Sequence, residues 1–598
     1  MENKKQAIIL SGVAIVALLA LIIGATYAYF RASGNSGSNT DINVTTYTLD
    51  LLSFEMGSDI KINADQTSFA SGKGNATGST FAKAILTANN KTNTATKNYY
   101  MYLNISNNTF TYTQNENTPE LLLTITDVSG NAITSITGLT YKTVIDGKGT
   151  SVSGFDITTK SGLLTLFDNR EITASPTKTE EWNVTVTFVN YNVNQTGNAG
   201  KSFNAKLMIQ QEEYELTLAD ICAGKTLSDC VISQYTGTQG DNALYYHNST
   251  LTNGAGDNSY RYAGGDYVLT EAGKATGATM MIGYNNSVTT ALIDFYCNGT
   301  KQYVGYASSC STSHYYLIKG DTTQYQTYNE ALNASVEKGY LTKDNVKNFV
   351  CFGSDATTCP TENLYRIIGV FNNHVKLIKY DYAKSSLLGT DGDFSQEYTS
   401  NYFSGEQGES PSSNSLYYWN NAGTNTWSAS KLNTVNLNTN FTTNIGTAWA
   451  NKIATTTWKV GGGTYANLRD AVPKTAYQYE VGSSASTTTY DAKIGLMYVS
   501  DYYYSASPSA WTLVGYNSDY TKSYASAKGE NWLYGGGWDW TISRSSVSSS
   551  SAFLVGNNGY VGYHNVGNND GVRPSFSLLS STTYVSGSGS MSDPVRIN

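Results

Sequence analysis

The sequence predicts a mainly β, multidomain protein, and three observations indicate this fold class. Charged residues make up only 14% of the chain, against roughly 25% in ordinary globular proteins. Segments in which apolar and polar residues alternate recur along the chain, a pattern typical of half-buried strands. The length of 598 residues suffices for several separate cores. We expect an apolar N-terminal helix at 1–30, a β-sandwich or jelly roll at 31–215, a disulfide-containing connector at 216–360 and an α+β domain at 361–598.

The first region predicts a helix that enters a membrane. The segment from Ala7 to Phe30 carries no charge, and at about 1.5 Å per residue it can cross a hydrocarbon core of ~30 Å. Lys4 and Lys5 precede the segment, which places the N-terminus in the cytoplasm and the rest of the chain outside. Small residues at its end suit a signal peptidase. Two interpretations therefore fit: a signal peptide cleaved near Ala28, or an uncleaved anchor.

The second region predicts a two-sheet sandwich, because apolar residues line one face of segment after segment. Turn clusters such as Asp127 to Asn131 separate these segments. The region has no His and no Cys, and its carboxylates are scattered, so we expect no catalytic site in it. The alternating sets are Tyr47, Leu49 and Leu51; Met101, Leu103 and Ile105; Leu121, Leu123 and Ile125; Trp182, Val184, Val186 and Phe188; and Phe203, Ala205, Leu207 and Ile209.

The six cysteines fall into three local couples in the middle of the chain, with seven, twelve and seven residues between the members. An even number of cysteines outside the membrane favours disulfides. Zinc is the alternative, but the C-x-x-C and H-x-x-x-H spacings that zinc sites use are missing. The predicted disulfides are Cys222 with Cys230, Cys297 with Cys310, and Cys351 with Cys359.

The connector is expected to be structural. Leu216 to Cys230 predicts a short helix closed by a disulfide, and Thr327 to Phe349 predicts helical pieces. His247 and His314 lie in tyrosine-rich segments without a matching acid or thiol nearby in the sequence. We expect both histidines to be polar surface residues.

The last region, 361–598, holds eight of the nine tryptophans and mixes strand and helix signals. Asn-Asn and Asn-Gly pairs between apolar segments are typical of hairpin turns. The expected elements are a hairpin at Asn372 and Asn373, two helices between Asn425 and Trp458, a strand at Lys493 to Ala506, a hairpin at Asn558 and Gly559, and a strand after Pro574.

Charge and motifs exclude several function classes. The net charge is −8, and no Lys/Arg cluster occurs beyond the N-terminus, which argues against nucleic-acid binding. The chain has no G-x-S-x-G elbow, P-loop, H-E-x-x-H or dinucleotide fingerprint, so we expect no enzyme. No cofactor is expected either. Calcium is the alternative at Asp391 to Glu397, although this segment lacks the glycine and the glutamate spacing of an EF-hand.

Aromatic and amide side chains near the end of the chain are the candidate ligand contacts, because flat rings and amides stack on sugars and adapt to protein surfaces. The 47 tyrosines, against 18 phenylalanines, also suggest rings at surfaces. A core role is the alternative for Trp532 and Trp538, and it is expected for Trp540, with Arg573 as an internal hydrogen-bond anchor. The candidates are Trp532, Trp538, Tyr560, Tyr563, His564, Asn565, Asn568 and Asn569.

Two stretches carry a resemblance to known families. "GATYAYF", "NVTTYTLDL" and "FVNYNVNQTGNAGKSFNAKLMIQ", within residues 1–215, resemble TasA/camelysin-type surface proteins of Gram-positive bacteria. That resemblance implies a jelly roll, cleavage by a SipW-type peptidase near Ala28, and assembly into matrix fibres. This chain is almost 400 residues longer than a simple fibre subunit would be, and its apolar segment is long enough for an anchor.

The end of the chain resembles uncharacterised bacterial surface domains with a C-type-lectin-like fold, which is also found in sulfatase-modifying proteins. The similarity rests on "WTIS", "AFLV", "NGYVGY" and "DGVRPSFSLL" within residues 361–598. The oxidising enzymes of that fold use cysteines, and none follows Cys359. The resemblance therefore implies a ligand-binding domain rather than an enzyme.

Three hypotheses follow from these patterns. The first is a cell-surface or secreted protein, on the outer face of a Gram-positive membrane or in its matrix, whose terminal domain binds a surface glycan or protein as an adhesin does. The second is a structural subunit that self-associates into a fibre through the sandwich. The third is an enzyme, which would be supported if substitution of one specified acidic residue or His abolished turnover.

Overall fold

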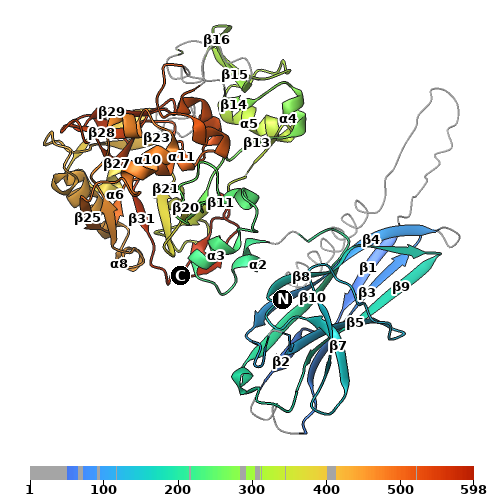
Figure 1. The fold of residues 1–598 in the computed structure, drawn as a ribbon. Helices are drawn as coiled ribbons and strands as arrows, with labels where there is room; N and C mark the ends of the chain where they lie inside the picture. The colour runs from blue at the N-terminus through green and yellow to red at the C-terminus, as the bar shows by residue number, and fades with distance from the viewer. Residues whose placement is uncertain are drawn as a thin grey trace, which may run out of the picture. The chain divides into compact units, whose positions relative to one another are not determined.

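The protein is described from a computed structural model. The described chain separates into two compact units, Met1–Leu216 and Thr217–Asn598, and each is treated by itself (Figure 1). The predicted apolar helix, the cleavage site at Ala28, and Tyr47 and Leu49 lie outside the described residues. Those residues are 50–64, 72–89, 94–115, 117–214, 217–282, 291–302, 310, 313–343, 345–400, 412–519 and 522–598.

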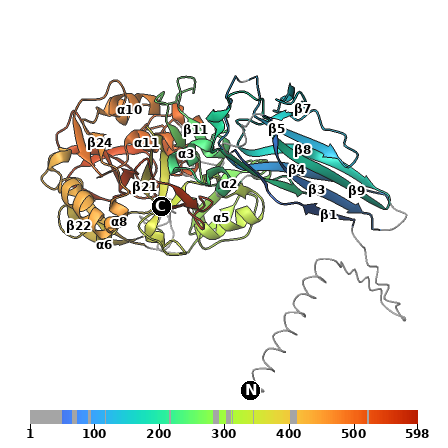
Figure 2. The ribbon, with the colours of Figure 1, turned by 90° about the horizontal axis from the view of Figure 1, so that it is seen from below.

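The first unit consists of two antiparallel sheets (Figure 2). One sheet has the strand order β1-β3-β9-β5-β7-β6, and the other has the order β2-β10-β4-β8. The strands are β1 (Leu51–Met56), β2 (Ile60–Asn63), β3 (Ala76–Thr87), β4 (Ala95–Asn108), β5 (Leu121–Asp127), β6 (Tyr141–Ile145), β7 (Ser151–Asp156), β8 (Gly162–Ala174), β9 (Thr177–Phe188) and β10 (Ser202–Gln210).

Side chains from both sheets meet in one apolar core, which explains the alternation in the sequence. Leu103 of β4 and Leu123 of β5 belong to different sheets, and both are fully buried in the same cluster. The alternating residues of β4, β5, β9 and β10 are all buried, so the period-two prediction is confirmed for these strands. Trp182 is the only tryptophan of this unit, and its Nε1 donates to Tyr99 Oη over 2.8 Å.

The second unit is built on a sheet with the order β11-β12-β20-β21-β31-β26, in which β19 also pairs with β20. Three of these strands, β11, β12 and β19, come from the sequence region 216–360. The residues assigned to the connector therefore share one compact unit with 361–598. The strands of this sheet are β11 (Leu244–Tyr246), β12 (Tyr260–Tyr262), β19 (Phe349–Cys351), β20 (Leu364–Phe371), β21 (His374–Lys379), β26 (Ile494–Gly495) and β31 (Ser575–Ser577).

The second unit also contains smaller sheets. The strands β14, β15, β16 and β17 form, with α5 (Tyr328–Glu337), a small lobe that has its own apolar cluster around Phe295. The remaining strands are β13 (Val268–Leu269), β14 (Met280–Ile282), β15 (Ala291–Cys297), β16 (Thr300–Gln302), β17 (His314–Ile318), β18 (Leu341–Thr342), β22 (Phe394–Ser400), β23 (Ser412–Tyr418), β24 (Thr456–Lys459), β25 (Thr489–Ala492), β27 (Asp539–Arg544), β28 (Ser551–Val555), β29 (Val561–Asn565), β30 (Asn569–Asp570), β32 (Tyr584–Ser586) and β33 (Arg596–Ile597).

The helices of the second unit are short. A π-helical segment at Leu432–Phe441 is stabilised by Asp393, whose carboxylate accepts the N–H groups of Leu432 and Asn421. Among the described residues, no helix has the length and apolar character needed to cross a membrane. The α-helices are α2 (Leu218–Cys222), α3 (Leu227–Ser233), α4 (Glu271–Ala275), α5 (Tyr328–Glu337), α6 (Ser385–Leu388), α7 (Thr442–Asn444), α8 (Thr447–Ala450), α9 (Tyr465–Leu468), α10 (Pro473–Glu480) and α11 (Val499–Tyr504).

Two local predictions have opposite outcomes. The hairpin of β20 and β21 turns at Asn372 and Asn373, which have φ angles of 48° and 62°, so the Asn-Asn prediction is confirmed. The strand predicted for 493–506 is wrong, because only Ile494–Gly495 is extended and Val499–Tyr504 is helical. The Asp501 carboxylate accepts the Tyr498 N–H over 2.8 Å and thereby caps the new helix.

The three disulfides join Cys222 with Cys230, Cys297 with Cys310 and Cys351 with Cys359, which are the couples that the spacing indicates. Disulfides persist in oxidising compartments, so this set is typical of an extracellular protein.

His247 corrects a prediction, since it is fully buried rather than at the surface. Its Nδ1 accepts the Ala255 N–H over 3.0 Å, and its ring packs edge-on against Tyr504. Burial lowers the pKa of His247 well below its ordinary value, and Arg261 lowers it further. Tyrosines likewise fill the core more than the sequence suggests, as Tyr502 and Tyr503 are both buried with bonded hydroxyls.

Candidate functional site

The site begins with the three-stranded antiparallel sheet β27-β28-β29, which lies near one edge of the second unit (Figure 1). Strand β29 starts with buried Val561 and ends with three more accessible residues, Tyr563, His564 and Asn565. Tyr563 lies opposite Phe553 in the ladder, and His564 lies opposite Ala552. The strand therefore presents an aromatic and an imidazole ring at the surface.

Tyr563 packs against residues from other parts of the chain. Its ring stacks on Tyr465, with centroids 4.3 Å apart and planes 26° apart. The Arg469 guanidinium lies 5.3 Å, 5.3 Å and 5.4 Å from the ring centroids of Tyr465, Tyr516 and Tyr563. Asp470 accepts two hydrogen bonds from the same guanidinium, at 2.8 Å and 2.7 Å, and so fixes its orientation.

A second row of rings continues this surface. Trp538 stacks on His564 with centroids 4.7 Å apart, and its ring meets Tyr560 edge-on at 5.8 Å. Tyr560 in turn meets Tyr516 at 5.6 Å. We call the whole set the aromatic band: Tyr465, Arg469, Tyr516, Trp538, Tyr560, Tyr563 and His564.

The imidazole of the band is held by a buried acid. His564 Nδ1 lies 2.8 Å from Asp570 Oδ2, and Asp570 is buried. Because a carboxylate only accepts, Nδ1 carries the hydrogen and Nε2 is the acceptor of the neutral ring. This contact fixes both the tautomer and the plane of the ring that Trp538 covers.

The predicted asparagines lie at the turn after β29. The Asn565 side chain accepts the Gly567 N–H over 2.9 Å, and its carbonyl accepts the Asn568 N–H over 2.8 Å. Asn565 and Asn568 are exposed, whereas Asn569 donates to Ser395 Oγ over 3.0 Å. The turn is therefore ordered by its own amides and places two of them beside the band.

Trp532 corrects the predicted set, because it lies in the interior and is 5% exposed. Its Nε1 donates to the Tyr262 carbonyl over 2.9 Å, and the Arg366 guanidinium lies 4.6 Å from its ring centroid. Arg366 is itself held by both carboxylate oxygens of Asp266 at 2.7 Å. Trp540 is also buried, and Arg573 bonds Asp539 and the Leu533 carbonyl, as expected for an internal anchor.

Three members of the band were missed by sequence reasoning. Tyr465 and Arg469 belong to the α9 region, and Tyr516 lies in a loop after α11. No local pattern links these segments to β29, since only the packing of the whole unit brings them together.

A charged cavity of about 290 Å³ lies elsewhere in the same unit. Two ion pairs line it, Arg261 with Asp257 at 2.6 Å and Lys376 with Asp501 at 2.5 Å. Although burial opposes ionisation of Asp257, Arg261 and the Ser259 hydrogen bonds lower its pKa to about 2. Phe371, Trp458, Tyr477 and Tyr498 form the aromatic walls. Lys459 also lines this cavity, so its lining carries three cations and two carboxylates.

The possible calcium residues are engaged in protein contacts. Asp391 accepts from Asn440 Nδ2 over 2.6 Å, Asp393 caps the π-helical segment, and Glu397 accepts from Ser415 Oγ. Within the described part of the chain, no group of three or more His, Cys, Asp or Glu side chains is arranged to hold a metal ion.

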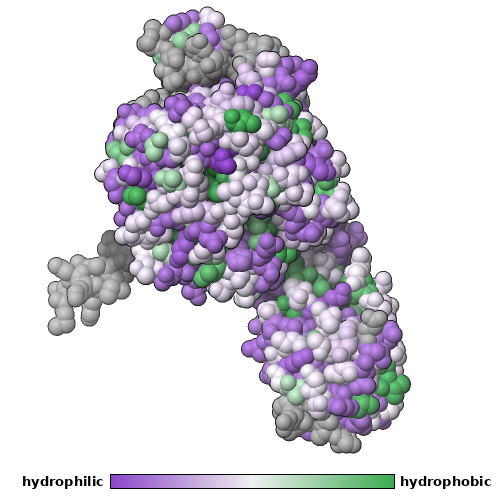
Figure 3. All heavy atoms as spheres, turned by 60° about the vertical axis from the view of Figure 1, so that its left-hand side comes forward, coloured by the Kyte–Doolittle hydropathy of each residue, from purple (hydrophilic) through white to green (hydrophobic). Residues whose placement is uncertain are grey.

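No family model matches the chain, and no curated protein matches it either. On the face drawn in Figure 3, hydrophobic residues occur as small patches among pale and hydrophilic ones. The geometry of the aromatic band is therefore the main indication of function.

Proposed function

We propose that this protein is an extracellular, non-enzymatic binding protein whose terminal unit holds a glycan or a protein ligand on the aromatic band. The contacts between Tyr465, Arg469 and Tyr563 carry the proposal. Stacked rings and a planar guanidinium are pre-ordered here, so little conformational entropy is lost when a flat ligand face lands on them. Exposed Asn565 and Asn568 add donors and acceptors beside the rings.

Sugar rings are the ligand chemistry that suits the band best. Their apolar faces stack on aromatic rings, and their hydroxyls need amide, imidazole and guanidinium partners. The band offers these groups side by side, with the His564 tautomer set by Asp570. The C-type-lectin-like resemblance of 361–598 points to the same class of function.

The test is a glycan array probed with the full protein and with a Tyr563→Ala variant. We expect the wild-type protein to retain a defined subset of glycans and the variant to lose that subset. Tyr479 is also exposed, on α10, and lies outside the band, so Tyr479→Ala is the matched control. Equal retention by wild type and Tyr563→Ala would argue against the band as the ligand surface.

A second function, fibre assembly through the sandwich, is favoured by one observation. Within the described residues, β1 pairs only with β3 and forms one edge of the six-stranded sheet, where Leu51 is 54% and Met56 45% exposed. An edge strand with open backbone groups can accept a strand from another copy. This hypothesis predicts filaments whose formation depends on concentration and stops when residues 29–52 are deleted.

Processing of the apolar segment Ala7 to Phe30 decides which form of the protein meets a ligand. We propose cleavage near Ala28, in line with the TasA/camelysin resemblance. The intact mass and N-terminal sequence of membrane and extracellular fractions test it. A start at Tyr29 in the extracellular fraction supports release and makes filament formation the next measurement. Retention of residues 1–30 in the membrane fraction instead supports a tethered binding protein.

A further inference from the structure

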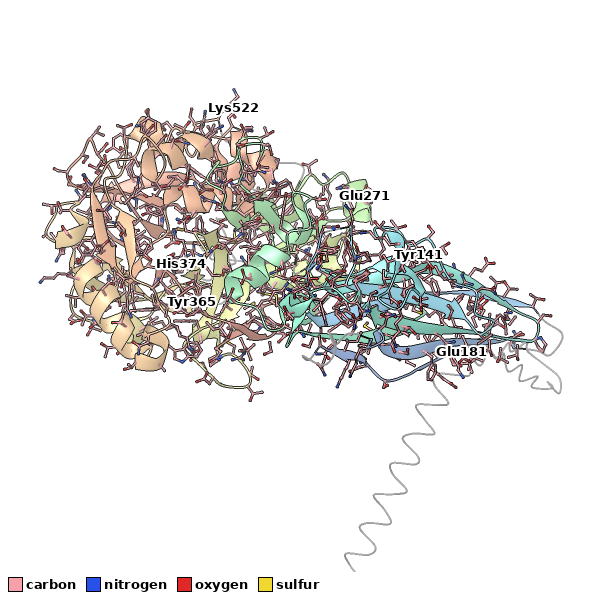
Figure 4. The ribbon with its side chains drawn as sticks, turned by 60° about the horizontal axis from the view of Figure 1, so that its bottom comes forward. Tyr141, Glu181, Glu271, Tyr365, His374 and Lys522 are labelled. Atoms are coloured by element: carbon pink, nitrogen blue, oxygen red, sulfur yellow. A yellow bond between two sulfur atoms is a disulfide. The ribbon has the colours of Figure 1, made fainter. Side chains whose placement is uncertain are left out.

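A second cavity, of about 320 Å³, opens beside the hairpin of β20 and β21. Tyr365 and Lys379 face each other across this hairpin and both line the cavity. Tyr365, which is labelled in Figure 4, is buried. Another wall is the loop after Cys351, which the Cys351–Cys359 disulfide closes. The rim is formed by exposed residues such as Glu362 and Lys384, so the cavity is reached from solvent.

Lys379 is the unusual group in this cavity. Its side chain is buried, with 3% of the residue exposed, and its ammonium lies 5.9 Å from the Tyr365 ring centroid. Across the described residues, this ammonium has no hydrogen bond and no ion pair within 4.0 Å. Lys376 on the same strand shows the usual arrangement, since it is also buried but pairs with Asp501 at 2.5 Å.

A charge on a largely buried side chain is costly when no carboxylate pairs with it. The pKa of Lys379 is lowered to about 8, mainly by burial; Lys384 and Arg573 also lower it, whereas Asp381 and Glu362 raise it. Lys379 is therefore still largely charged near neutral pH. An anion placed in the cavity would restore the missing partner.

The charges around the cavity limit which anion fits. Lys379 and Lys384 are balanced in number by Asp381 and Glu362, so the cavity has no surplus for a doubly charged phosphate. Asp381 already accepts the Tyr382 N–H over 2.7 Å, and burial raises its pKa. A single carboxylate can reach Lys379 with the least repulsion. The rest of a small ligand would contact Tyr365 and the polar side chains of Asn363 and Ser386.

We propose that the cavity at Lys379 binds a small ligand through one carboxylate, such as a sugar acid or an amino acid. The cavity volume lies at the lower end of the range for small-molecule sites, about 300–1,000 Å³. This site is independent of the aromatic band, since none of the band residues lines it. Failure of the band as a glycan surface would leave this proposal intact.

The test is calorimetric titration of the full protein with D-glucuronate and with D-glucose as the neutral analogue. Near pH 7 we expect glucuronate to bind about tenfold more tightly than glucose, or tighter still. Near pH 9 most Lys379 is neutral, so the affinity for glucuronate should be about tenfold lower than near pH 7. At that pH, binding of glucuronate should also take up a proton from the buffer. Titration with L-alanine and with propionate tests whether the ligand is an amino acid. Tighter binding of L-alanine than of propionate would indicate that Asp381 pairs with the ammonium group of the ligand.

Lys379→Met is the decisive variant, because it keeps the length of the side chain and removes the charge. It should lose glucuronate binding and proton uptake while unfolding at the same temperature or higher. Asp381→Asn removes the opposing charge and should strengthen binding of glucuronate. Lys522→Met, at the exposed position labelled in Figure 4, is the control and should change nothing. Equal binding of glucuronate and glucose, unchanged binding by Lys379→Met, or no binding of any carboxylate by the folded protein would overturn the proposal.

Discussion

Tyr563 of β29 stacks on Tyr465 of α9, with ring centroids 4.3 Å apart. Tyr563 is 39% exposed, whereas Tyr465 is partly buried and packs against the core of the unit. Their outer edges remain available while Arg469 restrains both rings from the side. Tyr465 therefore anchors the pair on the core, and Tyr563 is its exposed ring.

The first prediction concerns Arg469, which orders the stacked pair. Arg469→Ala removes the cation from three rings and leaves Tyr563 freer to change rotamer. We expect ligand affinity to fall by roughly tenfold and the free energy of unfolding to change by less than about 1 kcal/mol, since exposed cation–π contacts contribute about that much or less. Array binding and urea unfolding measure the two effects. Arg469→Lys keeps the charge but not the planar guanidinium, and should recover only part of the affinity.

The second prediction concerns Trp532, whose substitution should change stability rather than ligand binding. Trp532→Ala opens a cavity beside Arg366 and removes a hydrogen bond to Tyr262, so we expect a loss of about 3–5 kcal/mol in unfolding free energy. Trp532→Phe should cost less, because it keeps a ring under the guanidinium. Once folded, either variant should bind ligands as the wild type does. A Trp532 variant that has normal stability but does not bind would indicate that Trp532 contacts the ligand.

The sequence predicts the structural features that are determined by residues close together in the chain. Alternation placed Leu103 and Leu123 in the sandwich core, because burial on a strand depends on its own pattern. The Asn372-Asn373 turn is equally local. Val499–Tyr504 was mistaken for a strand because a helix with buried residues on every side has no amphipathic pattern.

The site was predicted only in part for the same reason. Tyr560, Tyr563 and His564 stand together in the sequence and were predicted as one group, whereas Tyr465 and Tyr516 join them only by tertiary packing. His247 was assigned to the surface because the residues that enclose it, Tyr504 and Trp511, are distant in the chain. Long-range burial of this kind has no signal in a single sequence.

The third prediction concerns the disulfides. Cys222 and Cys230 are buried, and their bond closes a loop with a sequence separation of 8. Substituting both by Ser should lower the unfolding free energy by about 2–3 kcal/mol. Denaturant unfolding with and without reductant measures this, and the double variant should respond less to reductant than the wild type. The mass of the denatured wild type should rise by about two units per reduced bond.

The fourth prediction is a pH dependence that arises from Asp257. Its pKa is about 2 in the folded protein, because Arg261 and Ser259 outweigh the effect of burial, whereas the ordinary value is 3.8. Since the unfolded chain takes up this proton first, the stabilisation is complete above about pH 5 and is lost as the pH falls towards 2. At about 1.4 kcal/mol per pKa unit, the contribution is about 2 kcal/mol.

Asp257→Asn tests this assignment. At neutral pH the variant should lose at least that contribution, and about 3–5 kcal/mol if Arg261 is left buried without its partner. Its unfolding free energy should also decline less steeply than that of the wild type between about pH 5 and 2. Exposed Asp355→Asn is the control and should reproduce the wild-type curve. An acid limb of equal slope in Asp257→Asn and wild type would show that the Arg261 pair does not set the acid stability of this unit.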